Sequence, residues 1–120
     1  MEQTNQNLIE ALLDGAKKAG ADAADAALAT GEALSVSVRL GKTESVERSE
    51  DFAAGLRVFV GQKVATLAIG QLAEADIPEL AQRAVAMAKA SPDDPYAILA
   101  RPDQTATDLP NLDMFDETDL

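Results

Sequence analysis

The sequence contains no histidine and no cysteine in its 120 residues. These two residue types supply most zinc sites and many of the activated nucleophiles in proteins. A serine nucleophile in this chain would lack its usual histidine base, and a Cys–His pair is excluded. The residues alone therefore predict a chain with no catalytic, cofactor-binding or metal-binding site of its own.

Aromatic side chains are also scarce, with one tyrosine, three phenylalanines and no tryptophan. Hydrophobic residues still make up 47% of the chain, so the core must be built mainly from Leu, Val, Ile and Ala. A chain of this length has room for one domain with a modest core. No apolar run approaches the roughly 20 residues that cross a bilayer, and no basic region precedes an apolar stretch at the amino terminus. We therefore expect a cytoplasmic protein with no membrane partner.

Basic residues are also few, because the sequence has 10 basic and 21 acidic residues and a net charge of −11. Such a chain repels the phosphates of nucleic acids, so we expect no direct nucleic-acid partner. Residues 1–90 hold 13 acidic and 9 basic side chains, net −4, whereas residues 91–120 hold 8 acidic and 1 basic, net −7. This difference predicts a domain over 1–90 and a separate acidic segment over 91–120.

The acidic segment carries four of the five prolines, Pro92, Pro95, Pro102 and Pro110. Prolines at this density cannot sustain a long helix, and the segment has little to bury. We expect an extended tail that acts as a linker, unless its spaced apolar residues dock on a surface. Those residues are Tyr96, Ile98, Leu99, Leu109, Leu112, Met114 and Phe115.

Two helices are predicted, over about 5–19 and 77–90. Apolar residues recur in both at intervals of three and four, which places them on one helix face. In the first helix they are Leu8, Ile9, Leu12, Leu13 and Ala16, and in the second they are Ile77, Leu80, Ala81, Ala84, Val85 and Ala88. Gly20 follows the first helix as a left-handed stop.

Between the helices, apolar and polar residues alternate with a period of two, which indicates β-strands. Strands are predicted over about 21–30, 34–40, 43–50, 55–61 and 63–69, with breaks at Gly31 and at residues 52–55. The alternation of Val36, Val38 and Leu40 with polar neighbours predicts one buried and one wet face. Short connections make the sheet mostly antiparallel. We expect an α+β fold with four to five strands and both helices packed on one face of the sheet.

Charged residues of the strands offer two candidate sites. The first is a carboxylate cluster for a divalent cation, made of Glu44, Glu47, Glu50 and Asp51. Residues 44 and 47 point to opposite faces of a strand, so a solvated edge is the favoured interpretation. The second is a cationic row of Arg39, Arg48 and Arg57 that could hold a carboxylate. Its more ordinary role is to pair with Glu44, Glu47 and Glu50.

Two further patterns favour no site. Asp93, Asp94 and the later aspartates lack the alternating ligands and the closing glutamate of a calcium loop, so a solvated acidic linker is the favoured interpretation. The glycines at 41, 55, 61 and 70 fall at predicted strand ends, and none opens a helix as a phosphate-binding loop does. They are therefore interpreted as turn residues.

An ordered set of segments resembles the amino-terminal domain of the TldD/PmbA family. The segments are Leu12 to Gly20, the run Val-Ser-Val-Arg-Leu-Gly-Lys-Thr-Glu-Ser-Val-Glu over 36–47, and Gly-Leu-Arg-Val-Phe-Val-Gly-Gln-Lys over 55–63. Asp-Asp-Pro-Tyr at 93–96 and Leu-Pro-Asn-Leu-Asp-Met-Phe-Asp at 109–116 are similar to the PmbA branch, also called TldE. The resemblance spans about residues 8 to 116.

This resemblance implies a longer parent protein in which residues 91–120 lead to a further C-terminal region. It implies a cytoplasmic heterodimer with a TldD-like subunit that carries the zinc motif and acts on peptides, including leader removal in the maturation of peptide antibiotics. The family has also been described as modulating DNA gyrase. Members of the PmbA branch act as the non-catalytic half, and no metal-binding position of the family matches a residue here. The alternative is a free-standing acidic interaction module with no link to a protease.

Overall fold

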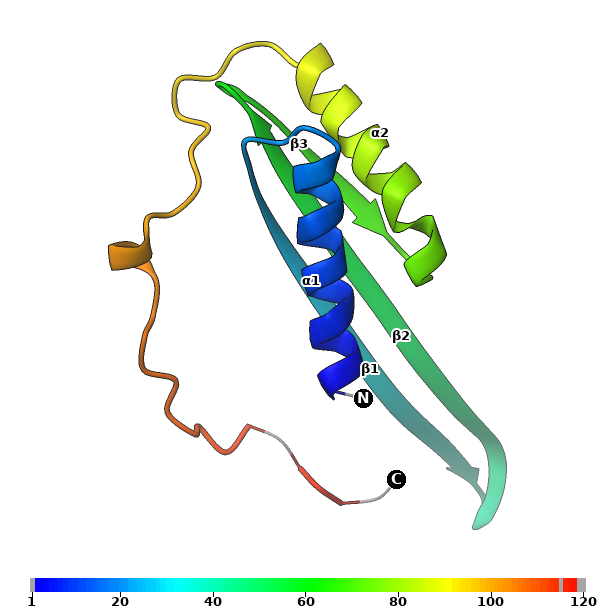
Figure 1. Cartoon of the computed structure of the whole chain (residues 1–120). Coiled ribbons are helices and arrows are strands. Elements are labelled where there is room, and N and C mark those ends of the chain that lie inside the picture. Colours follow the sequence, from blue (N-terminus) through cyan, green and yellow to red (C-terminus); the bar gives the residue numbers. More distant parts are fainter. Residues whose placement is uncertain (1, 115, 119–120) are drawn as a thin grey trace. The chain divides into compact units, whose positions relative to one another are not determined.

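The computed structural model of the chain describes residues 2–114 and 116–118 (Figure 1). Phe115, one of the tail residues expected to dock, lies outside the described residues. The elements follow the order α1 (Glu2–Lys18), β1 (Ala23–Arg39), β2 (Lys42–Val60), β3 (Lys63–Ile69), α2 (Ile77–Ala90), with short 3₁₀ turns at Glu74–Asp76 and Pro102–Gln104. The predicted α+β class, with two helices and an antiparallel sheet, is confirmed.

The core lies between the sheet and the two helices, which pack on the same face of the sheet (Figure 1). Leu12 and Ala16 of α1 are fully buried, as are Leu56 and Val58 of β2. From α2 the buried residues are Ile77, Ala81, Ala84, Val85 and Ala88. Four of these seven helix positions are alanines, and small side chains allow a helix backbone to approach its neighbours closely.

The sheet has three strands in the order β1-β2-β3, so the prediction of four to five strands is wrong. The predicted strands 21–30 and 34–40 are one continuous strand, β1, and those at 43–50 and 55–61 are the single strand β2. Gly31 and Gly55 lie inside these strands without the positive φ of a turn. The strands reverse instead at Leu40 and Gly41, with φ of 52° and 76°, and at Gly61, with φ of 61°. A glycine without left-handed backbone does not break a strand.

The chain divides into two compact units, one made of residues 1–32 and 50–99 and the other of residues 33–49 and 100–120. The domain boundary predicted near residue 90 stays a prediction. In the second unit, residues 33–49 form the end of the β1–β2 hairpin and are called the arm below.

The arm overturns the prediction that Val36, Val38 and Leu40 face a core. Their exposed fractions are 53%, 63% and 95%, and every residue from 29 to 51 is exposed. The cause is the length of β3, which pairs only with Ala54 to Val60 of β2. Beyond that point the sheet has two strands, and alternation of apolar residues no longer reports a buried face.

Residues 91–118 contain one 3₁₀ turn, at Pro102–Gln104, and neither α-helix nor strand among the residues described there. Across the described part of the chain, no helix is both long enough and apolar enough to cross a bilayer. The extended acidic tail expected from the sequence is taken up as a proposal below.

Candidate functional site

The four carboxylates that the sequence offered as a cation site do not come together. Glu44, Glu47, Glu50 and Asp51 are all exposed along β2. Among the described residues, no three carboxylate, histidine or cysteine side chains are grouped closely enough to hold a metal ion. These four residues therefore offer no cation site.

The three arginines of the predicted cationic row have different partners. Arg39 and Glu44 form an exposed ion pair across the arm at 3.6 Å, as predicted. Arg57 instead forms a bidentate pair with Asp25 of β1, with its Nε donating to Oδ1 at 2.9 Å and its terminal nitrogen to Oδ2. The sequence analysis missed Asp25 because the partner lies 32 residues away, in a stretch dominated by alanine.

Arg57 also covers an aromatic ring. Its guanidinium carbon lies 5.3 Å from the centroid of Phe59, two residues along β2, which is a cation–π distance. Phe59 is only 4% exposed. The hydrogen bonds from Arg57 to Asp25 raise the pKa of the guanidinium above its ordinary value, so it stays charged. With both partners satisfied, Arg57 stabilises the sheet and is not poised to receive a ligand.

A second aspartate fastens the start of β1 to the β2–β3 turn. The backbone N–H of Asp22 donates to the carbonyl of Phe59 at 2.8 Å, and its Oδ2 accepts from the N–H of Gly61 at 2.7 Å. Asp22 and Asp25 thus join an alanine-rich segment to β2. Both contacts stabilise the sheet.

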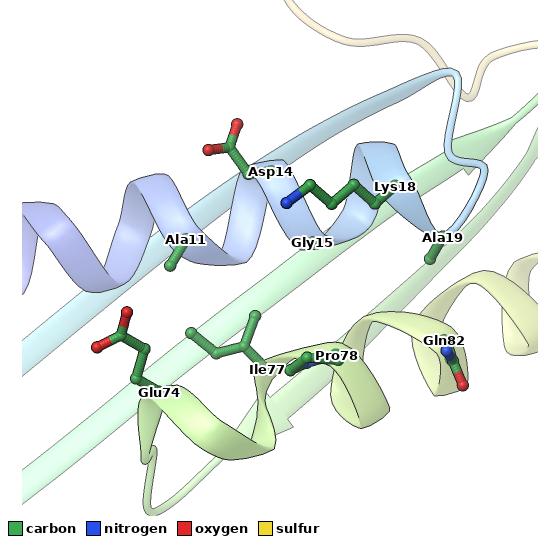
Figure 2. Close-up of a pocket in the computed structure, with 9 residues that line it drawn as sticks. All are labelled: Ala11, Asp14, Gly15, Lys18, Ala19, Glu74, Ile77, Pro78 and Gln82. Atoms are coloured by element: carbon green, nitrogen blue, oxygen red, sulfur yellow. The ribbon is translucent and has the colours of Figure 1, made fainter.

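A shallow groove of about 350 Å³ runs between α1 and α2 (Figure 2). Ala11, Gly15 and Ile77 line it together with the exposed charges Asp14, Lys18 and Glu74. A Cβ on Gly15 would lie 3.0 Å from Cγ2 of Ile77, so a larger residue here would require Ile77 to shift by a few tenths of an ångström. The charged side chains are solvated, and the buried part of the lining is apolar. This groove is a helix contact with no group placed for catalysis.

The arm presents the largest change from the sequence prediction. Leu34, Val36 and Val38 of β1 are 39%, 53% and 63% exposed, and Val46 of β2 is 60% exposed. On the same strand Ala24, Ala26 and Leu28 are partly buried against the core. Residues two apart share a strand face, so the apolar face of β1 continues onto the arm without cover. These four exposed residues are called the arm face below.

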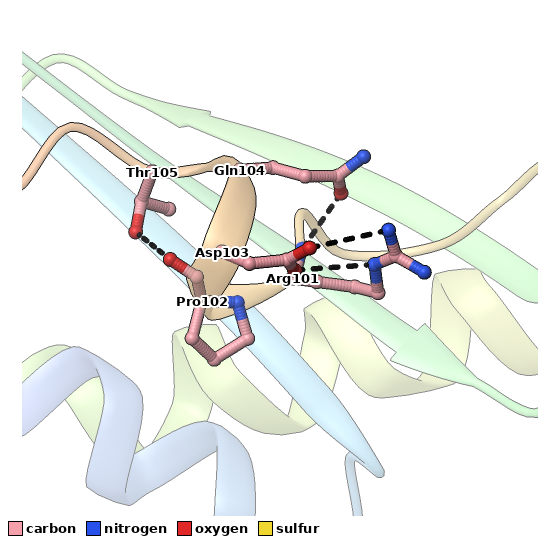
Figure 3. A network of polar contacts seen from close by, with 5 residues as sticks. All are labelled: Arg101, Pro102, Asp103, Gln104 and Thr105. Carbon is pink, nitrogen blue, oxygen red and sulfur yellow. Dashed lines mark hydrogen bonds and ion pairs between the residues drawn. The ribbon is translucent and has the colours of Figure 1, made fainter.

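The carboxyl-terminal segment is fastened near the turn between β2 and β3. The N–H of Asp94 donates to the carbonyl of Gln62 at 2.7 Å, and Nζ of Lys63 donates to the carbonyl of Lys89 at 3.1 Å. Further along, Arg101 pairs with Asp103 at 3.3 Å, and its N–H donates to Oε1 of Gln104 at 3.0 Å (Figure 3). The contacts of Arg101 are local and exposed, and they order a short turn within the segment.

Comparison with known proteins shows which protein family this chain is similar to. Residues 24–88 match the family model described as PmbA/TldA metallopeptidase domain 1. The chain is 34% identical over 119 residues to a metalloprotease PmbA homolog of Haemophilus influenzae, covering 99% of this chain and 26% of that protein. It is 32% identical over 94 residues to metalloprotease PmbA of Escherichia coli O157:H7, covering 78% of this chain and 21% of that protein.

A solved structure supports the fold. The chain superimposes on the crystal structure of a Bacteroides thetaiotaomicron protein described as a modulator of DNA gyrase, with a TM-score of 0.77 and 17% identity. The match covers 89% of this chain and 24% of that one. The chain thus spans about a quarter of the length of that protein and of the Haemophilus relative.

The family model matches 65 of the 120 residues, including most of the three strands and nearly all of α2. This is more than half of the chain, and both curated relatives carry the same family name. The chain therefore belongs to the PmbA/TldD metallopeptidase family and contains its amino-terminal domain.

Proposed function

We propose that the chain is the non-catalytic first domain of a PmbA-type subunit in a TldD-type metalloprotease complex that acts on peptides. The observation that carries this proposal is the match of residues 24–88 to PmbA/TldA metallopeptidase domain 1. Peptide processing, maturation and degradation are all activities of this class. The domain contributes structure and contacts, while the chemistry lies elsewhere in the complex.

The side-chain inventory supports a non-catalytic role. Zinc in proteins is held by Cys, His, Asp and Glu, and the first two are absent from the sequence. The carboxylates proposed from the sequence are solvated and spread along β2. Arg57 is already paired with Asp25 and Phe59. In this proposal a TldD-like subunit holds the zinc ion.

The same proposal covers the setting of the domain. The complex is a cytoplasmic heterodimer, and residues 91–120 form an extended acidic linker that leads from this domain into the rest of a longer protein. Support comes from the share of the relatives that the chain covers and from the prolines and net charge of −7 in this segment. The net charge of −11 disfavours a direct nucleic-acid partner, so any effect on DNA gyrase passes through protein contacts.

Deletion of the domain from the full-length parent tests the proposal. The parent without residues 1–90 is co-expressed with its TldD-like partner, and cleavage of a peptide substrate is measured. We expect processing to be lost, while the partner alone keeps its bound zinc by metal analysis. A matched control replaces only the exposed pair Arg39 and Glu44 by alanine and should retain processing.

Full processing by the truncated parent would refute the proposed role. The free-standing interaction module would then be the better explanation, since it requires no protease. The isolated 120-residue chain gives a second test, because we expect no stoichiometric zinc after dialysis against the metal. Retention of one zinc ion per chain would contradict the assignment of the metal to the partner subunit.

A further inference from the structure

The outer edge of β1 is open to a further strand. β1 lies at one end of the strand order β1-β2-β3 (Figure 1), and among the described residues its strand neighbour is β2 alone. Within the arm, residues 33–38 of this edge contain no charged residue and no proline. Charges and prolines are the usual means by which an exposed strand edge is kept from pairing with another chain. The β1 edge of the arm is therefore suited to strand addition.

The free edge of β2 is built in the opposite way. Pairing with β3 stops at Ala54, so the described part of the chain puts no strand beside β2 in the arm on that side. An incoming strand would have to accommodate many charges there, because six charged side chains lie within ten residues. They are Lys42, Glu44, Glu47, Arg48, Glu50 and Asp51. The uncharged edge of the arm thus belongs to β1.

The sequence of the β1 edge is complementary to itself in an antiparallel register. If Val36 lies on a two-fold axis, it faces Val36 of a second copy, and Leu34 faces Val38 of that copy. These residues share one face of the strand, so the register makes three apolar cross-strand pairs. On the other face Ser35 lies opposite Ser37, and short hydroxyl side chains can hydrogen-bond across strands. No charged residues lie opposite each other in this register.

Other registers fit less well. A shift by two residues toward the tip would bring Leu40 into the pairing, but Leu40 has a φ of 52° and lies in the turn beyond β1. A shift by two in the other direction would set Glu32 opposite Val38. A shift by one would place the apolar face of one copy beside the polar face of the other, because side chains alternate with a period of two. The register centred on Val36 is therefore the best match.

Pairing in this register supplies the support that the arm lacks. A two-stranded ribbon is marginally stable in water, whereas three or more strands with an apolar face are stable. Two paired arms form a four-stranded sheet. The arms overlap over residues 33–39, a length of about 23 Å at ~3.3 Å per residue. This is a small contact beside the roughly 800 Å² per partner of a stable interface, so we expect association that depends on concentration.

Charge also favours the arm as the place of contact. Two copies of a chain with net charge −11 repel each other. The arm carries Arg39, Lys42 and Arg48 against Glu44 and Glu47, a net charge of +1. Two copies can therefore approach through their arms with less repulsion than the chain as a whole produces.

We propose that two copies of this chain associate through their arms, with the β1 edges paired antiparallel about Val36. The contact is isologous, because the same residues of both copies meet about a two-fold axis. It concerns this chain alone, so it goes beyond the proposed peptidase role and does not rest on it.

Sedimentation equilibrium of the full chain, from micromolar to millimolar concentration, tests the association. We expect a monomer at the low end and a dimer at the high end. Added salt should increase the dimer fraction, because screening weakens the repulsion between the acidic copies.

Two aspartate variants then locate the contact. Val36→Asp would set two carboxylates opposite each other on the axis and remove an apolar pair, so it should weaken the dimer about tenfold or more. Val46→Asp is the matched control, since it adds the same charge to the arm face but on β2, away from the paired edge. It should weaken the dimer much less.

The absence of cysteine from the sequence allows a test without an added charge. In the proposed dimer, the two residues 36 lie one strand spacing apart, whereas the two residues 46 are separated by three spacings, about 14 Å. With a thiol crosslinker of shorter reach, Val36→Cys should form a covalent dimer and Val46→Cys should stay monomeric. Cysteine is a small apolar residue, so this test decides the matter if Val36→Asp disturbs the hairpin.

Three results would overturn the proposal. A chain that stays monomeric at millimolar concentration would show that the edges do not pair. Equal weakening by Val36→Asp and Val46→Asp would assign the dimer to burial of the arm face. Equal crosslinking at positions 36 and 46 would contradict pairing through the β1 edges.

Discussion

Two aspartates, Asp22 and Asp25, hold the alanine-rich start of β1 against β2. Helix propensity alone would extend residues 21–30 as helix, yet the chain is a strand from Ala23. Gly20 ends α1 with a φ of 104°. Asp22 then bonds the β2–β3 turn and Asp25 pairs with Arg57. Long-range polar contacts therefore decide the local structure of a segment whose side chains are mostly small.

Asp22→Ala tests this role at a single residue. The substitution removes the acceptor for the N–H of Gly61, which lies 2.7 Å away. Loss of a side-chain cap on a backbone N–H costs about 1 kcal/mol, and this corresponds to roughly 4–8 °C in the melting temperature of a small domain. Asp22→Asn keeps an acceptor oxygen and should lose less than half as much. Equal melting temperatures for Asp22→Ala and the parent chain would exclude the bond as a stabilising contact.

Asp116 offers a residue-scale prediction about pH. The hydroxyl and the N–H of Thr118 donate to its carboxylate at 2.6 and 2.9 Å, and they lower the pKa of Asp116. A carboxyl with a depressed folded-state pKa contributes stability above its unfolded pKa, and this contribution is lost as pH falls through the folded pKa. The contact between Asp116 and Thr118 should therefore loosen on acidification, as the pH falls through the lowered pKa of Asp116.

An NMR titration of the side-chain carboxyl checks this sign. Thr118→Ala should raise the pKa of Asp116 toward the ordinary aspartate value, because the hydroxyl bond is removed. Thr105→Ala removes a hydroxyl that donates to the carbonyl of Pro102 instead, so it should leave Asp116 unchanged. A pKa that is the same in all three proteins would contradict the assignment.

At the scale of elements, the sequence predicted the helices better than the strands. The predicted ranges 5–19 and 77–90 lie close to Glu2–Lys18 and Ile77–Ala90, because an apolar stripe with a period near 3.6 is a strong local signal. Two glycines were interpreted as strand breaks, so each of the two long strands was predicted as two shorter ones. Only the backbone angle distinguishes Gly31 and Gly55 from Gly41 and Gly61, and composition does not determine that angle.

Contact between α1 and α2 gives the prediction at this scale. A Cβ at Gly15 would lie 3.0 Å from Cγ2 of Ile77 and 3.4 Å from Cβ of Ala81. Ile77 is buried and β-branched, so it has little room to move. Gly15→Leu should destabilise the chain by about 1–3 kcal/mol, as overpacking does in other cores. Thermal unfolding measures the loss.

Gly31→Ala is the matched control for Gly15→Leu. A Cβ at Gly31 meets nothing within 4 Å, so this substitution should change stability by less than about 0.5 kcal/mol. If Gly15→Leu were as stable as the parent chain, the two helices would not be packed as closely as the structure shows.

At the scale of the whole molecule, local patterns identified the fold class and, through resemblance, the family. They did not reveal which apolar residues are covered. Val36 and Val58 follow the same alternation in the sequence, yet one is 53% exposed and the other fully buried. Burial of a strand residue depends on which other elements pack against that part of the strand. The pairing of Asp25 with Arg57, 32 residues away, likewise depends on the fold. Such information arises only when distant segments are placed together.

Deletion of the arm tests whether the core depends on it. Every residue from 29 to 51 is exposed, whereas the buried residues belong to α1, α2 and the parts of β2 and β3 that pair with each other. Replacing residues 33–49 by an Asn-Gly turn between Glu32 and Glu50 keeps a tight hairpin connection. We therefore expect the shortened chain to fold with a melting temperature within a few degrees of the parent chain, by circular dichroism.

Hydrogen exchange gives a second measure of the same deletion. The amides of α1 and α2 should exchange with solvent at the rates of the parent chain, and NMR follows them residue by residue. Loss of the helical core on deletion would contradict this expectation, because it would show that the exposed arm stabilises the core.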